Sequence, residues 1–326
     1  MADKIKLIFF NIFKKISELL IRIRIHRRLP FIVSIYNFLF QYFWPYKDVI
    51  EIQGSRMYVN INDEDMSMRN TFQGYASNLI HEKSTTELFK KIVKERNTTV
   101  DLGANIGYFT LLAAKLVGPE GKLFAFEPEP KNYSYLVKNI KLNNYNQVIA
   151  LQKAVSNKCG KTNLYICDYD SGHHTINKYE GIEAYSRGRT TKEYSIEIET
   201  ITLDEFFKEK ENSIDVIKMD VEGAEALALA GMDNILKVNK KLKMFVEFFP
   251  LLIEKMGDSP SEFIRKILED YRFSVYIIPD DYDASKGETR KVNSVEEVMS
   301  FRKKEEDHVN LFLKHNENNK ISSKKN

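Results

Sequence analysis

The chain has 326 residues, of which 43% are hydrophobic and 29% charged, and its formal net charge is +3. This length and apolar content suffice for one large buried core, although length alone would also allow two domains. Its two cysteines, Cys159 and Cys167, provide neither a disulfide framework nor the spacing of a zinc site. Such cysteine usage is typical of a reducing compartment, so we expect a cytoplasmic protein.

The basic excess is confined to the N-terminal region. Residues 1–48 contain nine Lys and Arg against three acidic residues, whereas the remainder contains 40 basic and 43 acidic residues. Within residues 4–28, large apolar residues recur at helical spacing, which predicts a basic amphipathic helix suited to an anionic membrane surface. The next run, residues 31–46, is apolar and aromatic but shorter than the roughly 20 residues of a spanning helix. We therefore expect residues 4–45 to bind peripherally at the inner face of a membrane.

Other interpretations of this region compete with membrane binding. A helix pair packed on the rest of the chain or on a second subunit has almost equal support, and the sequence does not fix the oligomeric state. A secretory signal is disfavoured because the apolar stretch is crowded with Arg and lacks a small-residue cleavage site. Nucleic acid is disfavoured as a partner because large aliphatic residues interrupt the basic residues.

Four segments are predicted in chain order. They are an N-terminal extension (1–48), a β-hairpin and lead-in (49–83), the main domain (84–315) and a disordered tail rich in Asn, Lys and Ser (316–326). The hairpin is expected from alternating residues around Gln53-Gly54-Ser55-Arg56. A helix is predicted over 84–96, and for His81, just before it, a surface or helix-start position is favoured over catalysis.

A glycine turn in residues 100–110 predicts a nucleoside cofactor. Val100 and Leu102 suit a buried strand, Gly103 and Gly107 allow a tight turn, and a helix is expected from Tyr108 to Leu116. The two glycines stand four apart, unlike the spacing of a dinucleotide fingerprint, and an acid, Asp101, precedes them. A carboxylate suits an ammonium group better than a phosphate, which favours S-adenosylmethionine as the cofactor.

A second acid supports the same cofactor. Glu127 closes a strand over 122–127, where its carboxylate can accept hydrogen bonds from both ribose hydroxyls. A helix over 131–143 and a strand over 148–151 follow.

A long connection interrupts the next two strands. The strands are predicted over 162–167 and 193–200 and are expected to pair. The polar connection between them, residues 169–192, contains tyrosines, histidines and arginines suited to a sugar and an attached phosphate, so it is either a substrate lid or a disordered loop.

Carboxylates follow the fourth and fifth predicted strands, 216–219 and 244–248. Ligands of open α/β sheets bind beyond the carboxyl ends of the strands, so Asp220, Glu222 and Glu247 are the predicted catalytic residues. S-adenosylmethionine donates a methyl group, and Asp220 is favoured as the base that takes the proton of the hydroxyl that accepts it. Asp220 is also favoured as a helix cap. Glu225 would lie on the same side if a helix begins at Gly223. These carboxylates could hold Mg²⁺, but no specific metal motif is present.

Four blocks together resemble the FkbM-type S-adenosylmethionine-dependent methyltransferases. The blocks are Asp101-Leu102-Gly103-Ala104-Asn105-Ile106-Gly107, Phe126-Glu127-Pro128, Ala154-Val155-Ser156 and Ile217-Lys218-Met219-Asp220-Val221-Glu222-Gly223-Ala224-Glu225. The resemblance covers roughly residues 75–250 and implies a Rossmann-like class I methyltransferase fold, with a mostly parallel, doubly wound sheet and helices on both faces.

The resemblance also implies an activity and a set of cofactor contacts. Family members mostly methylate an oxygen, often a sugar hydroxyl, so the expected acceptor is a small molecule, a glycan or a glycolipid-like molecule. Ala154 and Val155 are implied to lie against the adenine, and the family often has a glutamate near the position of Glu82. The residues implied to bind the cofactor are Asp101, Gly103, Ala104, Asn105, Gly107, Tyr108, Glu127, Pro128, Ala154 and Val155.

Two other classes of protein remain open at this stage. A nicotinamide-dependent reductase would explain the glycine turn and Glu127, but the chain lacks a Tyr-x-x-x-Lys pair after a middle strand. A membrane-associated protein that binds the cofactor without catalysis is the other. The absence of an Asn/Asp-Pro-Pro-Tyr segment after the fourth strand argues against methylation of a base or an amide.

Overall fold

The computed structural model describes most of the chain. The described residues are 9, 10, 12, 13, 15, 38–40, 42, 44, 48–60, 63, 66–76, 80–167, 172–176, 194–209, 213–279, 288–305 and 307–315. The predictions for residues 4–28, 31–46, 169–192 and the tail from 316 therefore lie largely or wholly outside the described residues. The chain divides into two compact units, residues 1–80 and 81–326, so His81 and Glu82 belong to the second unit.

The first unit contains the predicted hairpin. Its strands β1 (Val49–Ile52) and β2 (Ser55–Tyr58) pair antiparallel, and helix α3 (Met66–Ala76) follows. The predicted four-residue turn is wrong. Gln53 and Gly54 both adopt positive φ, 49° and 76°, so two residues complete the turn and Ser55 and Arg56 already belong to β2.

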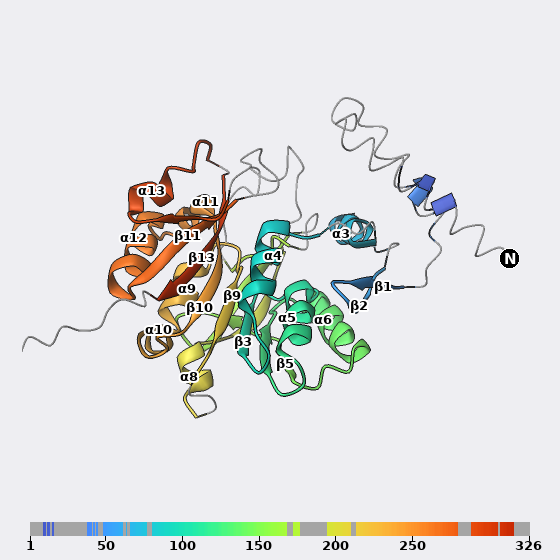
Figure 1. The fold of residues 1–326 in the computed structure, drawn as a ribbon, viewed down its shortest axis with the longest axis horizontal. Coiled ribbons are helices and arrows are strands. Elements are labelled where there is room, and N and C mark those ends of the chain that lie inside the picture. Colours follow the sequence, from blue (N-terminus) through green and yellow to red (C-terminus); the bar gives the residue numbers. More distant parts are fainter. Residues whose placement is uncertain are drawn as a thin grey trace, which may run out of the picture. The chain divides into compact units, whose positions relative to one another are not determined.

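An eight-stranded sheet forms the centre of the second unit (Figure 1). Its strand order is β12-β11-β13-β10-β9-β3-β4-β5. The strands are β3 (Thr98–Leu102), β4 (Lys122–Phe126), β5 (Val148–Leu151), β9 (Val216–Met219), β10 (Lys243–Phe248), β11 (Phe273–Ile278), β12 (Arg290–Val292) and β13 (Val309–His315). The neighbours from β10 to β5 are parallel, and β13 runs antiparallel to β10 and β11. The predicted mostly parallel α/β sheet is confirmed.

Helices cover both faces of this sheet. They are α4 (Lys83–Ile92), α5 (Tyr108–Val117), α6 (Pro130–Leu142), α8 (Leu203–Phe207), α9 (Glu225–Ala230), α10 (Asp233–Val238), α11 (Pro250–Lys255), α12 (Pro260–Arg265), which a π-helical turn (Lys266–Asp270) extends, and α13 (Val295–Met299). On one face, Phe89 of α4 contacts Phe109 of α5 and Phe245 of β10. On the other face, Val246 and Phe248 of β10 join apolar residues of α8, α10 and α12 in one core cluster.

Successive strands are added to the sheet on opposite sides of β3. From β3 the sheet continues to β4 on one side and to β9 on the other. The carboxyl ends of β3 and β9 therefore mark the topological switch point, beyond which open α/β sheets bind their ligands.

A separate three-stranded sheet has the order β6-β8-β7, with β6 (Ala154–Val155), β7 (Gly160–Ile166) and β8 (Tyr194–Ile201). The predicted pairing of β7 with β8 is confirmed and is antiparallel. Of the connection between them, residues 172–176 are described, and Thr175 bridges back to Tyr165.

Several predicted element ends shift for local reasons. Helix α4 ends at Ile92 rather than Arg96, because Val93 adopts an extended conformation. Helix α6 begins at Pro130 because the Glu129 carboxylate accepts a hydrogen bond from the backbone N–H of Asn132. Among the described residues, no helix combines the length and the apolar character needed to cross a membrane.

Candidate active site

The glycine turn follows the buried strand β3. Gly103 and Gly107 have φ of 76° and 102°, values that side-chain-bearing residues rarely adopt. The backbone N–H groups of Gly103 and Ala104 both donate to the carbonyl of Phe126, at 3.0 and 2.9 Å, which ties the turn to the end of β4. Helix α5 then begins at Tyr108, as predicted, with its first amides directed toward the turn.

The turn also meets the loop after β9. A Cβ atom at Gly103 would lie 1.7 Å from the carbonyl oxygen of Asp220, so this approach requires glycine. The backbone N–H of Asp220 donates to the carbonyl of Leu102 at 3.1 Å. The ends of β3 and β9 are thus fixed side by side, so the glycine turn and the loop of Asp220 and Glu222 lie next to each other at the switch point.

Glu127 is buried beneath the turn. Its two carboxylate oxygens accept backbone hydrogen bonds from Asn105 at 2.7 Å and from Glu129 at 2.9 Å. Each oxygen keeps a second lone pair for a further donor, such as a ribose hydroxyl. Burial raises the pKa of Glu127 to about 8, although both amide donors favour the charged form.

The remaining predicted cofactor residues fall into two places. Pro128 follows Glu127 on the same loop. Ala154 and Val155 form the buried strand β6, which comes directly after β5, and the N–H of Glu127 donates to the carbonyl of Leu151 at the end of β5. The adenine contact implied for Ala154 and Val155 remains a prediction.

Asp101 is the acid on which the choice of cofactor depended. It is 2% exposed, and its Oδ2 accepts a hydrogen bond from the Thr110 hydroxyl at 2.5 Å. Its Oδ1 is buried and has no hydrogen-bond partner among the described residues. Burial raises the pKa of Asp101, against the opposing attraction of Lys218. An unsatisfied buried acceptor at this place fits a donor such as the ammonium group of S-adenosylmethionine.

The three predicted catalytic carboxylates lie together. One ligand oxygen each from Asp220, Glu222 and Glu247 lies within 4.8 Å of the others. All three side chains are partly exposed, and Glu222 adopts a positive φ of 53°. Oxygens this close could hold one divalent cation or accept hydrogen bonds from the hydroxyls of an acceptor.

Asp220 is paired with a buried cation. Lys218 is 5% exposed, and its Nζ donates to Asp220 Oδ2 at 2.6 Å while lying 4.8 Å from the centre of the Phe109 ring. Burial alone would raise the pKa of Asp220, but Lys218 and a hydrogen bond from Glu247 hold it below its ordinary value. Burial and the charges of Asp220 and Glu222 raise the pKa of Glu247 well above its ordinary value. These opposite pKa shifts favour protonation of Glu247 before Asp220.

The predicted capping role of Asp220 is wrong. Helix α9 begins at Glu225, not at Gly223, and its N-cap residue Ala224 makes no side-chain cap. Instead, Glu225 Oε1 accepts from the backbone N–H groups of Val221 and Gly223, at 3.1 and 3.3 Å. Glu225 thus supports the loop from its buried side, and burial raises its pKa to about 7.

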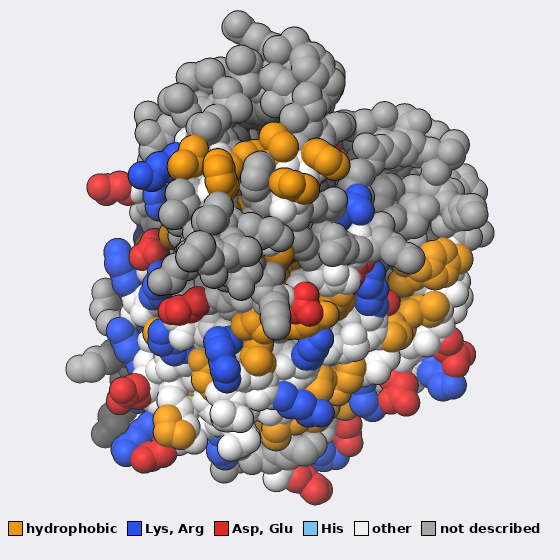
Figure 2. All heavy atoms as spheres, turned by 90° about the vertical axis from the view of Figure 1, so that its right-hand side faces the viewer, with side chains coloured by type: hydrophobic (Ala, Val, Ile, Leu, Met, Phe, Trp, Pro, Cys, Tyr) orange, Lys and Arg blue, Asp and Glu red, His pale blue; other side chains and the backbone are white. Residues whose placement is uncertain are grey.

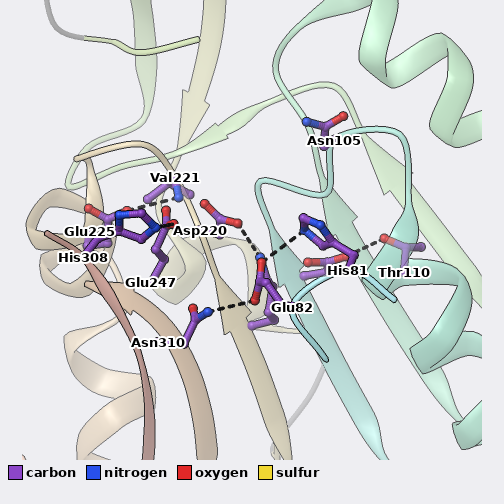
Figure 3. A network of polar contacts seen from close by, with 12 residues as sticks. His81, Glu82, Asn105, Thr110, Asp220, Val221, Glu225, Glu247, His308 and Asn310 are labelled. Carbon is purple, nitrogen blue, oxygen red and sulfur yellow. Dashed lines mark hydrogen bonds and ion pairs between the residues drawn. The ribbon is translucent and has the colours of Figure 1, made fainter. Parts of the chain in front are cut away.

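A second polar network borders the cluster (Figure 3). His81 Nε2 lies 3.1 Å from Glu82 Oε1, and Glu82 Oε2 accepts from Asn310 Nδ2 at 3.0 Å. In Figure 3, His81 and Glu82 lie between Asn105 of the glycine turn and the carboxylates of Asp220 and Glu247. On the far side of the cluster, His308 Nε2 lies 4.0 Å from Glu247 Oε1.

Sequence analysis gave no role to Lys218 or Asn310. A lysine inside the otherwise apolar strand Val216–Met219, two residues before Asp220, is a signal that could have identified Lys218 as a buried partner. Asn310 lies 228 residues after Glu82, and no local pattern marks that pairing.

The fold and the turn define a nucleoside-binding α/β domain, and comparison with known proteins gives its family. The family model described as "Methyltransferase FkbM domain" matches residues 101–275, more than half of the chain. The chain therefore belongs to the FkbM methyltransferase family. This membership confirms the predicted class I methyltransferase fold and S-adenosylmethionine as the cofactor of the domain.

Two curated proteins are similar to this chain. Methyltransferase sdnD of Sordaria araneosa is 32% identical over an alignment of 156 residues, and the match covers 41% of this chain and 60% of that protein. Methyltransferase 1 of Beauveria bassiana (strain ARSEF 2860) is 28% identical over an alignment of 145 residues, and the match covers 41% of this chain and 58% of that protein. The chain thus spans about three-fifths of the length of these relatives.

Among solved structures, the methyltransferase FkbM of Methylobacillus flagellatus KT is similar at 12% identity. The alignment covers 77% of this chain and 55% of that chain with a TM-score of 0.40, a value too low to inform on the site.

Proposed function

We propose that this protein transfers a methyl group from S-adenosylmethionine to a hydroxyl oxygen, and that the acceptor is a sugar of a glycan or glycolipid-like molecule. The observation that carries this proposal is the close approach of Gly103 to the Asp220 carbonyl. This approach holds the glycine turn beside the loop that carries Asp220 and Glu222, whose oxygens lie close to those of Glu247. A methyl donor and a polyol acceptor would therefore meet there.

The chemistry of the cluster favours a hydroxyl acceptor. Carboxylate oxygens accept hydrogen bonds from vicinal hydroxyls, and three carboxylates within 4.8 Å offer more acceptors than an apolar or amide substrate would use. On the face drawn in Figure 2, side chains of Lys and Arg lie among those of Asp and Glu over the described residues. This distribution supports a small or glycan acceptor rather than a polyanion.

The cofactor residues bind and orient the donor. Asp101 and Glu127 accept hydrogen bonds from the ammonium group and the ribose, and Gly103, Ala104, Asn105, Gly107 and Tyr108 shape the turn around it. When bound, S-adenosylmethionine supplies a methyl group on a sulfonium, which is displaced in line by the acceptor oxygen. The chain's own tasks are then to align the acceptor hydroxyl and to remove its proton.

The sequence assigns proton removal to Asp220, directly or through Mg²⁺ held by Asp220, Glu222 and Glu247. The crowding of these oxygens supports the binding of a cation, and the Lys218 contact supports an Asp220 that stays ionised. Addition of EDTA followed by Mg²⁺ separates the two routes, because only the metal route would lose its rate and regain it.

A role for the N-terminal region at an anionic membrane surface is proposed on a different observation. Phe10 and Phe40 are buried against each other with ring centres 5.3 Å apart, so the segments around residues 10 and 40 pack together. Four large apolar side chains of the same segments are 51–66% exposed, namely Phe9, Ile12, Phe38 and Tyr42. Such a surface supports insertion into the headgroup region.

The methyl-transfer proposal is tested by binding and turnover. Calorimetry should give micromolar affinity for S-adenosylmethionine, equivalent to about 8 kcal/mol, and no binding of NADH. S-adenosylhomocysteine should form when sugar nucleotides or glycolipids are added as acceptors and should not form with an analogue whose reacting hydroxyl is replaced by hydrogen. Binding of NADH in preference to S-adenosylmethionine would contradict the proposal.

A further inference from the structure

His81 is a candidate for proton removal that the sequence did not favour. We propose that the His81 imidazole is the general base that takes the proton of the acceptor hydroxyl, and that Glu82 and Asn310 are the residues that position it. This inference rests on the proposed methyl transfer, and it replaces Asp220 as the base.

The position of His81 is fixed by the start of the cofactor helix. Its ring meets the ring of Tyr108 edge to face at 5.2 Å and that of Phe109 at 6.1 Å. Its backbone carbonyl accepts a hydrogen bond from the Thr86 hydroxyl at 2.6 Å, and this hydroxyl lies 3.2 Å from the Tyr108 hydroxyl. Tyr108 directly follows the glycine turn, so these contacts hold the imidazole at the mouth of the cofactor site. The side chain is 39% exposed and hence open to an acceptor.

Glu82 orients the imidazole. Its Oε1 lies 3.1 Å from His81 Nε2, and its Oε2 is held by Asn310 of β13 at 3.0 Å. Glu82 is itself in the left-handed region, with φ of 41°, at the N-cap of α4, and its side chain is 14% exposed. A carboxylate facing Nε2 favours the tautomer with hydrogen on that nitrogen and the lone pair on Nδ1. The arrangement is that of a base with an orienting acid.

The alternative base is less suited on geometry. Asp220 Oδ2 is engaged by the ammonium of Lys218 at 2.6 Å, and Lys218 is 5% exposed. Protonating Asp220 would leave a buried ammonium without its contact partner, which is costly. Asp220 therefore remains an anion that accepts a hydrogen bond from the acceptor, while the neighbouring imidazole is the side chain most often used as a base at neutral pH.

In the methyl transfer, a lone pair of the acceptor oxygen forms the O–C bond to the methyl carbon as the S–C bond breaks. The electron pair of the S–C bond stays on sulfur, which becomes the neutral thioether of S-adenosylhomocysteine. The O–H proton passes to His81 Nδ1. The imidazolium then releases the proton to water and restores the base.

A binding experiment tests this placement without a known acceptor. S-adenosylmethionine carries a sulfonium charge that S-adenosylhomocysteine lacks, and the two are otherwise alike except for the methyl group. An imidazolium beside the sulfonium would weaken binding of the first selectively. We expect the ratio of the dissociation constants, S-adenosylmethionine over S-adenosylhomocysteine, to fall about tenfold between about pH 5.5 and about pH 8 in the full-length protein.

Other charged groups near His81 are controlled for. Glu82 and Asp220 interact electrostatically with His81, and Lys218 and Asp101 interact with both of these carboxylates. Ionisation of the carboxylates whose pKa is raised, Asp101, Glu127, Glu225 and Glu247, would act in the same direction, so the readout is the difference between H81N and the unmodified protein, with E247Q as the matched control. The pH-dependent change should shrink in H81N and remain in E247Q, and H81Q repeats the test if H81N does not bind S-adenosylhomocysteine.

The possible results distinguish failure of the role of His81 from failure of the proposed function. The role of His81 is overturned if the ratio of dissociation constants does not change with pH in the unmodified protein. It is also overturned if the change is undiminished in a histidine variant that still binds S-adenosylhomocysteine. No binding of either molecule to the unmodified protein overturns the proposed function itself. With an acceptor in hand, H81N should lose on the order of 10²–10⁴ in rate and regain part of it with free imidazole, whereas D220N should retain the pH dependence of the unmodified enzyme.

Discussion

Glu127 holds the ribose in this account, although backbone amides already engage both of its oxygens. Glu127→Ala should weaken S-adenosylmethionine binding by about 1.5–3 kcal/mol, because both ribose hydroxyls lose the carboxyl oxygens that accept their hydrogen bonds. Calorimetry measures this loss. Glu129→Ala is the matched control, since Glu129 caps α6 and should alter stability rather than affinity. Equal affinities in Glu127→Ala and the unmodified protein would remove the ribose assignment.

Glu127 also makes stability depend on pH. Its pKa of about 8 in the folded chain exceeds the ordinary value of 4.5, so the folded chain holds a proton that the unfolded chain has lost between these values. The stability due to this proton is complete below about pH 4.5 and is lost as the pH rises toward 8. The free energy of unfolding, measured with urea, should decline from about pH 5 to about pH 8. This decline should be smaller in Glu127→Gln than in the unmodified protein by on the order of 3–4 kcal/mol. Parallel declines in the two proteins would contradict this pKa.

Lys218 and Asp220 are expected to be strongly coupled. Asp220→Asn should lower the free energy of unfolding by about 3–5 kcal/mol, because it leaves the buried Lys218 ammonium without its partner. Lys218→Met should cost less, because the Asp220 carboxylate that it leaves is partly exposed. The double variant should cost less than the sum of the two, with a coupling of about 1–3 kcal/mol. If the losses in the free energy of unfolding are additive, the contact between Lys218 and Asp220 does not contribute to stability.

The site could be predicted only in part at the residue scale. Asp220, Glu222 and Glu247 were expected to meet because parallel strands end at one edge of a sheet, and they do. The contact of Asn310 with Glu82 joins residues 228 apart in sequence, so no local pattern predicts it. Lys218 was missed although it lies only two residues before Asp220. Sequence patterns report periodicity along the chain and not which buried group faces which.

At the scale of elements, the glycine turn works by bringing two loops into contact. Gly103→Ala would place a Cβ 1.7 Å from the Asp220 carbonyl oxygen, so β3 and β9 would have to separate. Gly257→Ala is the control, because Gly257 also has a positive φ, 85°, but a Cβ there would meet nothing within 4 Å. Gly103→Ala should lose cofactor binding, and Gly257→Ala should keep it at a cost of about 1–2 kcal/mol in stability. Equal behaviour of the two variants in calorimetry and urea unfolding would contradict this account.

The parallel core was the most predictable set of elements. β3, β4, β5 and β9 are short apolar runs between helical patterns, and the strand expected over 122–127 differs from β4 by one residue. The start of α9 was missed because Glu225 folds back onto Val221 and Gly223 instead of leaving the loop open for Asp220 to cap. The antiparallel strands β11, β12 and β13 were missed because their pairing is set by neighbours distant in sequence.

At the scale of the molecule, the two units have different expected roles. The first unit exposes Phe9, Ile12 and Phe38, and basic residues surround them in sequence. The full chain should sediment with anionic vesicles, and binding should fall as salt rises. Replacing these three side chains by Ser should abolish sedimentation, whereas Ile149→Ser, at a position of similar exposure in β5, should not. Equal sedimentation of both variants would favour packing on protein as the role of this region.

The central claim is methyl transfer to a hydroxyl oxygen, and the most direct test follows the methyl group. The full-length protein is incubated with S-adenosylmethionine carrying a trideuterated methyl group and with sugar-containing acceptors, and the products are analysed by mass spectrometry and NMR. We expect the labelled methyl group as an ether on a sugar oxygen, formed in equal amount with S-adenosylhomocysteine. Label on nitrogen or carbon, or cofactor binding with no transfer to any hydroxyl acceptor, would contradict the account.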